Sequence, residues 1–213
     1  MIKKATILIL LALLFLQCGK KSGTNPDDEL TAAQLATKGW DKLSLLDLED
    51  AITYFESALS RDVTLTSANV GRGWVLLLQN STNYAAIENH FIKGKSDAVW
   101  AKDANCGLAV LRLLRNQYSE SITACDLVLG ENSKYAFSYL PSIDWHDLLV
   151  IKAEAQFQLK NYNGANTTIN QIGNEFSLDP QDPQTWIIDG TQYFSFQSAL
   201  SKAIEILADR YKF

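Results

Sequence analysis

The feature that most constrains this chain is a pattern of apolar residues that fits two short helices joined by a tight turn. Between Gly39 and Leu59, small and apolar residues recur at intervals of three and four, the spacing of one helix face. One stripe ends at Leu43 and the next begins at Ala51, so a turn is expected near residues 46–48. Gly39 and Ala51 are small enough to let the two helices cross closely. The segment therefore predicts a helical hairpin.

This hairpin pattern returns along the chain. The pair Gly39–Trp40 is followed 34 residues later by Gly73–Trp74, and a period of that size predicts an array of stacked hairpins. The return helix of the second hairpin is expected to end near Gly94, with its apolar set slipped by about one residue against the first. Two further hairpins follow, marked by Leu108, Ala109, Leu113, Tyr118, Ser121, Ile122, Cys125, Val128 and Leu129, and by Leu149, Ala153, Phe157, Tyr162, Ala165, Ile169 and Ile172.

These residues resemble a known repeat family. Gly39, the turn residues Asp47-Leu48 and the run Ala51-x3-Phe55-x2-Ala58-Leu59 are similar to the tetratricopeptide repeat, as is Asn161-Tyr162-x2-Ala165 in the fourth hairpin. Leu48 replaces the family's usual aromatic residue, and Val63 replaces its closing proline. The resemblance covers Thr31 to Gly173. It implies an all-α, right-handed α–α superhelix of about four hairpins that binds other proteins.

Three segments lie outside the repeat spacing. Tyr193 to Tyr211 has an apolar face and a charged face, and it predicts a C-terminal helix that caps the last hairpin. The connections 130–143 and 176–188 are long and contain aromatic residues. Connections of this length either pack on the body of a domain or form part of a binding site.

The N-terminal residues read as a targeting segment rather than as part of the fold. Lys3 and Lys4 precede an apolar run that is too short to span a bilayer, the layout of a signal peptide. The run ends in Phe15-Leu16-Gln17-Cys18, which resembles a bacterial lipobox, and this resemblance implies acylation of Cys18. An uncleaved anchor, or secretion with Cys18 incidental, is the alternative. The expected organisation is a signal peptide over 1–17, a lipidated cysteine and tether over 18–28, and a helical domain over 29–213.

Charge limits the classes of partner. Removal of residues 1–17 takes away two lysines and no acidic residue, which lowers the formal net charge from −5 to −7. An acidic body disfavours binding to nucleic acid and to anionic lipid surfaces. Attachment to a membrane is therefore expected to depend on the acyl chains at the N-terminus.

Residue types that carry out catalysis are sparse. The two histidines, His90 and His146, are far apart in sequence, and neither has a second His or Cys at the spacing of a metal site. Asp144 and Asp147 lie near His146, where they are expected to cap the fourth hairpin. There is no nucleophile elbow and no phosphate-binding loop. The sequence predicts a protein that is not an enzyme and has no cofactor or metal.

Two cysteines of the third hairpin are expected to face each other. Cys106 and Cys125 belong to its two helices and come to nearly the same level when the chain turns near Gln117. In an oxidising envelope they could form a disulfide, provided that their Cα atoms approach within about 7 Å. The alternative is two buried free thiols that pack as small apolar groups.

Partner binding is expected on the first helices of the hairpins. In this family the residue after the crossing glycine often faces the concave groove, and here that place is taken by Trp40, Trp74, Val110 and Glu154. The indoles could hold an apolar side chain or stack on a sugar, and Tyr135 in the long connection could join them. Alternatively, both indoles pack against neighbouring helices. These residues leave no place for the asparagine–lysine clamp with which some members bind C-terminal carboxylates.

Two functional hypotheses follow. The first is a non-catalytic lipoprotein that serves as an interaction scaffold in the bacterial envelope, expected at the outer membrane facing the periplasm, since Gly19 rather than Asp follows Cys18. Similar small repeat lipoproteins are accessory parts of outer-membrane protein assembly or of pilus and secretin assembly. The second is a surface or periplasmic protein that captures a glycan or peptide on its aromatic groove.

Overall fold

The structure is a computed structural model of the chain, and it describes residues 26–131, 134–173 and 175–211. The chain divides into two compact units, residues 1–30 and residues 31–213. In the first unit the described residues form the 3-10 helix η2 (Pro26–Glu29). The predicted signal peptide and Cys18 lie outside the described residues. None of the helices in the described ranges has both the length and the apolar character needed to cross a bilayer.

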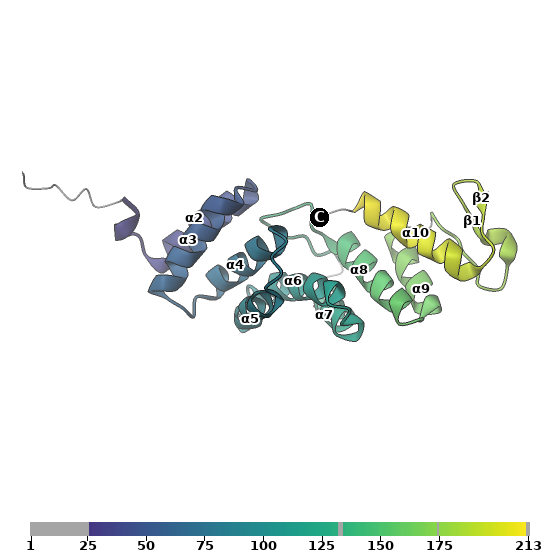
Figure 1. Cartoon of the computed structure of the whole chain (residues 1–213), viewed down its shortest axis with the longest axis horizontal. Coiled ribbons are helices and arrows are strands. Elements are labelled where there is room, and N and C mark those ends of the chain that lie inside the picture. Colours follow the sequence, from purple (N-terminus) through teal and green to yellow (C-terminus); the bar gives the residue numbers. More distant parts are fainter. Residues whose placement is uncertain (1–25, 132–133, 174, 212–213) are drawn as a thin grey trace, which may run out of the picture. The chain divides into compact units, whose positions relative to one another are not determined.

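The second unit consists of four consecutive helical hairpins followed by one more helix, as predicted (Figure 1). Each helix packs against its hairpin partner and against the next hairpin along the chain. The hairpins are α2 (Ala32–Ser44) with α3 (Leu48–Arg61), α4 (Thr66–Leu78) with α5 (Tyr84–Gly94), α6 (Ala101–Leu114) with α7 (Tyr118–Glu131), and α8 (Trp145–Gln158) with α9 (Tyr162–Ile172); α10 (Phe196–Arg210) follows.

All four hairpins turn in the same way. One residue in each turn has a positive φ, and its N–H and the next N–H donate to carbonyls of the last helical turn, which is the Schellman arrangement. In the first hairpin Leu46 N donates to Leu43 O and Asp47 N donates to Lys42 O. The positive-φ residues of the turns are Leu46, Asn80, Asn116 and Lys160, with φ of 58°, 54°, 58° and 61°.

The slip predicted for the second hairpin is an insertion in its turn, and it amounts to two residues rather than one. Tyr84 begins α5 as Leu48 begins α3, and Phe91 takes the place of Phe55. The extra length lies in the turn, where Ser81 and Thr82 precede the N-cap Asn83, so the apolar face of the return helix keeps its register.

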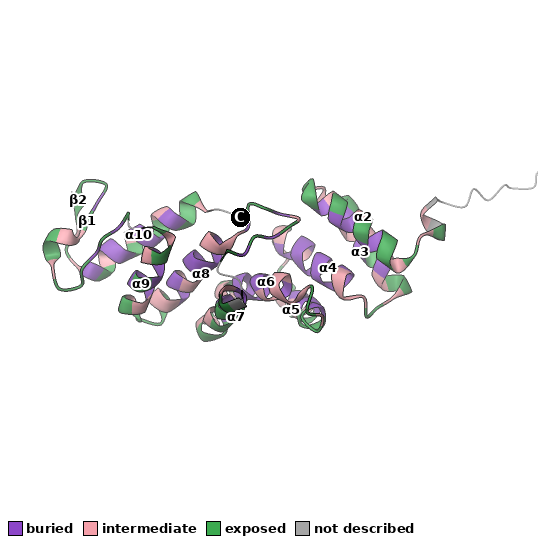
Figure 2. Ribbon diagram, turned by 180° about the vertical axis from the view of Figure 1, so that it is seen from behind, coloured by how far each residue is buried: buried purple, intermediate pink, exposed green. Residues whose placement is uncertain are grey.

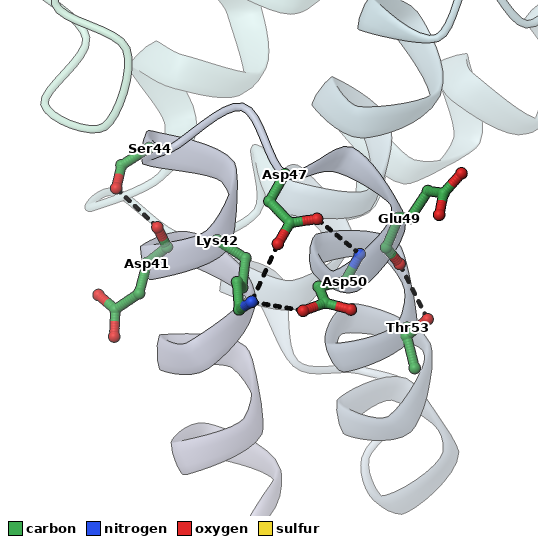
Figure 3. Close-up of polar contacts among 7 residues, drawn as sticks. All are labelled: Asp41, Lys42, Ser44, Asp47, Glu49, Asp50 and Thr53. Carbon is green, nitrogen blue, oxygen red and sulfur yellow. Dashed lines mark hydrogen bonds and ion pairs between the residues drawn. The ribbon is translucent and has the colours of Figure 1, made fainter.

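The first turn is held by a charged network (Figure 3). The Asp47 carboxylate caps α3 by accepting from Asp50 N at 3.3 Å, and it also accepts from Lys42 Nζ at 2.9 Å. Lys42 Nζ donates to Asp50 as well. These contacts raise the pKa of Lys42 and lower that of Asp47. All three groups are solvent-exposed to a large degree, so the network orients the turn more than it stabilises the fold.

In the first two hairpins, the helices cross where a glycine of one helix packs against a phenylalanine ring of another. A Cβ on Gly39 would lie 2.7 Å from the ring of Phe55, and one on Gly71 would overlap the same ring. Phe91 fits in the same way between Gly73 and Gly107. Each ring is fully buried and lies between its own first helix and the next one, which sets the spacing between hairpins.

The third and fourth hairpins pack with smaller residues. Ala109 and Ala153 take the place of the crossing glycines, and both are fully buried. In the third hairpin, Ser121 Oγ donates to Ala109 O at 2.8 Å across the crossing. Figure 2 shows that α4, α6 and α8 carry long runs of buried residues.

The C-terminal segment completes the core. Helix α10 covers the apolar side of α8 and α9 with a cluster that includes Leu200, Ala203 and Leu207, so the predicted cap is confirmed. The connection before it contains a short antiparallel pair, β1 (Ile187–Ile188) with β2 (Thr191–Gln192), in which Ile188 is opposite Thr191. Asn166 Nδ2 donates to Leu178 O at 2.9 Å and fixes this connection to α9.

Candidate functional site

We define the groove face as the side of the first helices that carries Trp40, Trp74, Val110 and Glu154. Part of this face is covered by residues 134–144, here called the aromatic segment, which connect α7 to α8 and reach α2 and α4 (Figure 1). The segment is held by its own backbone: Phe137 N donates to Ile143 O at 2.9 Å and Trp145 N donates to Tyr135 O at 2.9 Å. The long connection therefore packs on the body of the domain.

The aromatic segment buries both candidate tryptophans. Trp40 is 1% exposed and stacks on Tyr139 at 4.5 Å and on Trp100 at 4.9 Å between ring centroids. Trp74 is fully buried against Phe137 at 5.1 Å, and its Nε1 donates to Asp103 O at 3.2 Å. Of the two alternatives for these indoles, the structure shows the one in which they pack inside the protein, because the aromatic segment and neighbouring helices surround them. Neither Trp40 nor Trp74 exposes an indole face on which a sugar could stack.

Tyr135 is also buried, in a polar cluster beneath the aromatic segment. It is 2% exposed, and its hydroxyl donates to Asp103 Oδ1 at 2.8 Å. Burial raises the pKa of Asp103 to about 6 although the tyrosine hydrogen bond opposes the shift. Tyr135 therefore anchors the segment to α6 and is not available to a partner in this structure.

The two cysteines are free thiols in this structure, and both are fully buried. Burial raises the pKa of both thiols, and Cys106 also makes a hydrogen bond with Tyr135. The disulfide that their position in the hairpin allowed is thus not formed here. Protonated, inaccessible thiols of this kind serve as packing groups.

Beyond the aromatic segment, the groove face is open. A cavity of about 530 Å³, here called the open groove, lies over α6, α8 and α10. Its walls include Val110 and Glu154, two of the four positions predicted to face a groove. A smaller cavity of about 260 Å³ between α4 and α6 shares Val110 and Leu114 with it, and Trp74 lines the other side of this smaller cavity. The open groove is lined by Val110, Leu113, Leu114, Asp147, Val150, Ile151, Glu154, Ser201, Ile204, Glu205, Ala208 and Tyr211.

The polar lining of the open groove is acidic. Asp147 is 2% exposed and belongs to the capping box of α8, where its Oδ2 accepts from Asp144 N at 2.7 Å. The predicted cap is thus confirmed. Its Oδ1 is buried and has no hydrogen-bond partner among the described residues. Burial raises the pKa of Asp147 to about 6, because the charged form is poorly solvated there.

The other two carboxylates of the open groove are more accessible. Glu154 Oε1 accepts from Gln158 Nε2 at 2.7 Å, and Glu205 Oε1 pairs with Lys202 Nζ at 2.7 Å. Lys202 does not line the groove, and the lining described by the structure contains no Lys, Arg or His. The groove therefore combines apolar walls with a negative electrostatic potential.

The comparisons with known proteins concern the fold. No protein-family model matches the sequence, and no curated protein is similar to it by sequence. A crystal structure of a tetratricopeptide repeat protein from Parabacteroides merdae ATCC 43184 is similar in structure, with a TM-score of 0.53 over 97% of this chain and 75% of that chain. The two sequences are 15% identical. This chain has the fold of a tetratricopeptide repeat array.

Both histidines make hydrogen bonds or ring contacts within the repeat array. His90 is buried, and its Nδ1 donates to Asn69 Oδ1 at 2.9 Å; burial lowers its pKa to about 4. His146 stacks on Tyr211 at 4.7 Å and contacts Asp144. Within the described residues, no group of three or more His, Cys, Asp or Glu side chains is arranged to hold a metal ion.

Sequence reasoning found some of the open groove and missed the rest. Val110 and Glu154 were identified from their place after the crossing residue. The contribution of α10, through Ile204 and Glu205, was missed because this helix was interpreted only as a cap. Asp147 was recognised as a capping residue, but no sequence signal indicates that one of its oxygens lacks a partner.

Proposed function

We propose that this protein binds a peptide segment of a partner protein in the open groove over α6, α8 and α10. The observation that carries the proposal is that the aromatic segment covers the groove face at Trp40 and Trp74, whereas the nearly buried Val110 and the half-buried Glu154 border a cavity. The volume of about 530 Å³ is enough for a few side chains of a peptide. The repeat fold supports this class of function, since arrays of this kind generally present such surfaces.

Site-specific photo-cross-linking in cells tests the proposal. A benzophenone amino acid is placed at Ser201, an exposed residue of the groove lining, and in a matched variant at Thr123, an exposed residue of α7 outside the lining. We expect one protein, identified by mass spectrometry, to be captured from Ser201 and not from Thr123. Capture of the same protein from Thr123, or no capture from Ser201, would contradict the proposal.

We further propose that the protein acts as a lipid-anchored scaffold of the bacterial envelope, held at the outer membrane by acyl chains on Cys18. The support is the charged start, the apolar run and the lipobox-like sequence Phe15 to Cys18. Metabolic labelling with a radioactive fatty acid tests this. Label on the native chain and its loss in Cys18→Ser, with release of that variant from the membrane fraction, is the expected result. An unlabelled native chain would overturn it.

A further inference from the structure

We infer that the open groove receives a basic side chain of the partner's peptide, Arg or Lys, with Asp147 as its counter-charge. This inference rests on the proposed function, since it specifies the chemistry of the segment that the groove binds. It is carried by three observations: a buried carboxylate oxygen without a partner, an acidic lining, and apolar walls beside it.

The cap of α8 uses only half of the Asp147 carboxylate. One oxygen accepts from Asp144 N, while Oδ1 is buried and unpartnered among the described residues. A buried acceptor without a donor destabilises a fold, and an asparagine would satisfy the same cap without a charge. The fold itself therefore does not require the second oxygen or the negative charge. A donor arriving from outside would satisfy both.

The surrounding charges select a cation. Glu154 and Glu205 line the same groove, and the described lining supplies no positive group to balance them. Glu205 shares its charge with Lys202, whereas Asp147 is the carboxylate of the lining that is withdrawn from solvent. A guanidinium or ammonium group would form a charge-assisted hydrogen bond with Asp147. A carboxylate ligand would be repelled by all three acids.

The walls suit the rest of such a side chain. Val150, Ile151 and Ile204 are nearly fully buried apolar residues of the lining, and Val110 lies on the side of α6. Arg and Lys pack their methylene stems on apolar surface while the charged end reaches a polar partner. The groove thus matches an aliphatic stem with a cationic end better than a purely apolar or an acidic side chain.

Two small probes test the inference on the purified full chain. The first is N-acetyl-Leu-Arg-amide, and the second is its citrulline counterpart, which has nearly the same shape but no charge. Binding is followed by NMR titration of the labelled protein. We expect the arginine probe to bind about tenfold or more tightly than the citrulline probe, as for a charge-assisted hydrogen bond. This comparison requires no mutation and so does not depend on a variant that folds.

Two variants test whether the Asp147 carboxylate is the charge that favours the arginine probe. Asp147→Asn keeps an oxygen for the cap, and it should abolish the difference between the probes. Asp126→Asn, on α7 and paired with Lys152 at 2.6 Å, removes one acid outside the groove and should leave the difference unchanged.

Equal binding of both probes would overturn the basic anchor while leaving a peptide groove in place. Binding of neither probe, together with no capture from Ser201, would overturn both proposals.

Discussion

The two ends of the groove face contain equivalent positions in different surroundings. Over α2 and α4, Trp40 and Trp74 are buried beneath an aromatic segment that the chain supplies from a distant connection. Over α6 and α8, the equivalent Val110 and Glu154 line a cavity, and one oxygen of Asp147 in its lining has no hydrogen-bond partner among the described residues. The same repeat position thus stabilises the fold in one half and remains open in the other. The presence of a groove position in a repeat does not by itself indicate a binding residue.

The largest effect on stability is expected in the part of the groove face over α2 and α4, here called the closed half; the part over α6 and α8 is called the open half. Trp40→Ala removes a buried indole that stacks on Trp100 and Tyr139, and it should lower the free energy of unfolding by about 3–5 kcal/mol. Glu154→Ala, at the equivalent position of the open half, should change it by less than about 1 kcal/mol. Urea denaturation of both variants measures the contrast. Equal effects would show that the closed half is no more structural than the open one.

The closed half should also lose stability in acid. The folded pKa of His90 is lowered to about 4, mainly by burial and also by Arg72 and Lys93, so protons bind the unfolded chain preferentially between about pH 6.5 and 4. The contribution of neutral His90 is complete above pH 6.5 and falls by about 2 kcal/mol at pH 5. Urea titrations at pH 7 and 5 should therefore be compared between the native chain and His90→Gln, which retains a donor for Asn69. The opposing gains of Asp103 and Asp147 on acidification are common to both proteins, so the variant should gain about 2 kcal/mol relative to the native chain from pH 7 to 5. An equal response of the two proteins would contradict the assignment.

The open half should respond in the opposite direction. The folded pKa of Asp147 is raised to about 6, mainly by burial and against the opposing hydrogen bond from Asp144 N, so its ionised form costs stability as the pH rises from about 4 to 6. We expect Asp147→Asn to stabilise the free protein at pH 7 by about 1–2 kcal/mol, and the gain should vanish below pH 4. The pKa of Asp103 is also raised to about 6, and this residue is present in both the native chain and the variant, so its contribution cancels in the comparison. Thermal unfolding across this pH range measures the gain, and a destabilised variant at pH 7 would contradict the account.

The hairpin turns should not distinguish the halves. Leu46 in the first turn and Lys160 in the last are exposed residues with a positive φ, which glycine adopts without strain. Leu46→Gly and Lys160→Gly should each raise the free energy of unfolding by a similar amount, about 0.5–1 kcal/mol. Differential scanning calorimetry checks this. A gain in one turn only would indicate that the halves differ in their backbone as well as in their groove face.

The sequence predicts the repeated part of this fold well because helix faces are local patterns. The stripes that include Phe55 and Phe91 identify the hairpins, and small residues such as Gly39 identify the crossings. The closed half could not be predicted from the same signal. Its cover brings Trp100 and Tyr139 onto Trp40, and such pairing depends on tertiary packing rather than on periodicity.

The candidate site was partly predictable because the positions on a helix face follow from a local sequence pattern. Repeat register placed Val110 and Glu154 on the groove face, but it also placed the two tryptophans there, and no local pattern says which positions the chain will cover. The positive φ in the first and last turns was also not predictable from residue type, since neither Leu46 nor Lys160 favours a positive φ. That one oxygen of Asp147 has no partner among the described residues is known only once the helices are packed.

If the open half binds a partner because it lacks the aromatic filling of the closed half, then transplanting that filling should abolish binding. Glu154→Trp places an indole where the repeat register has Trp40 and Trp74, and Glu154→Gln is the matched control that removes only the charge. The measurement is the cross-linking yield from Ser201 in each background, with folding verified by circular dichroism. The account predicts that the partner is lost with tryptophan and largely retained with glutamine. An unchanged yield in a folded Glu154→Trp protein would contradict it.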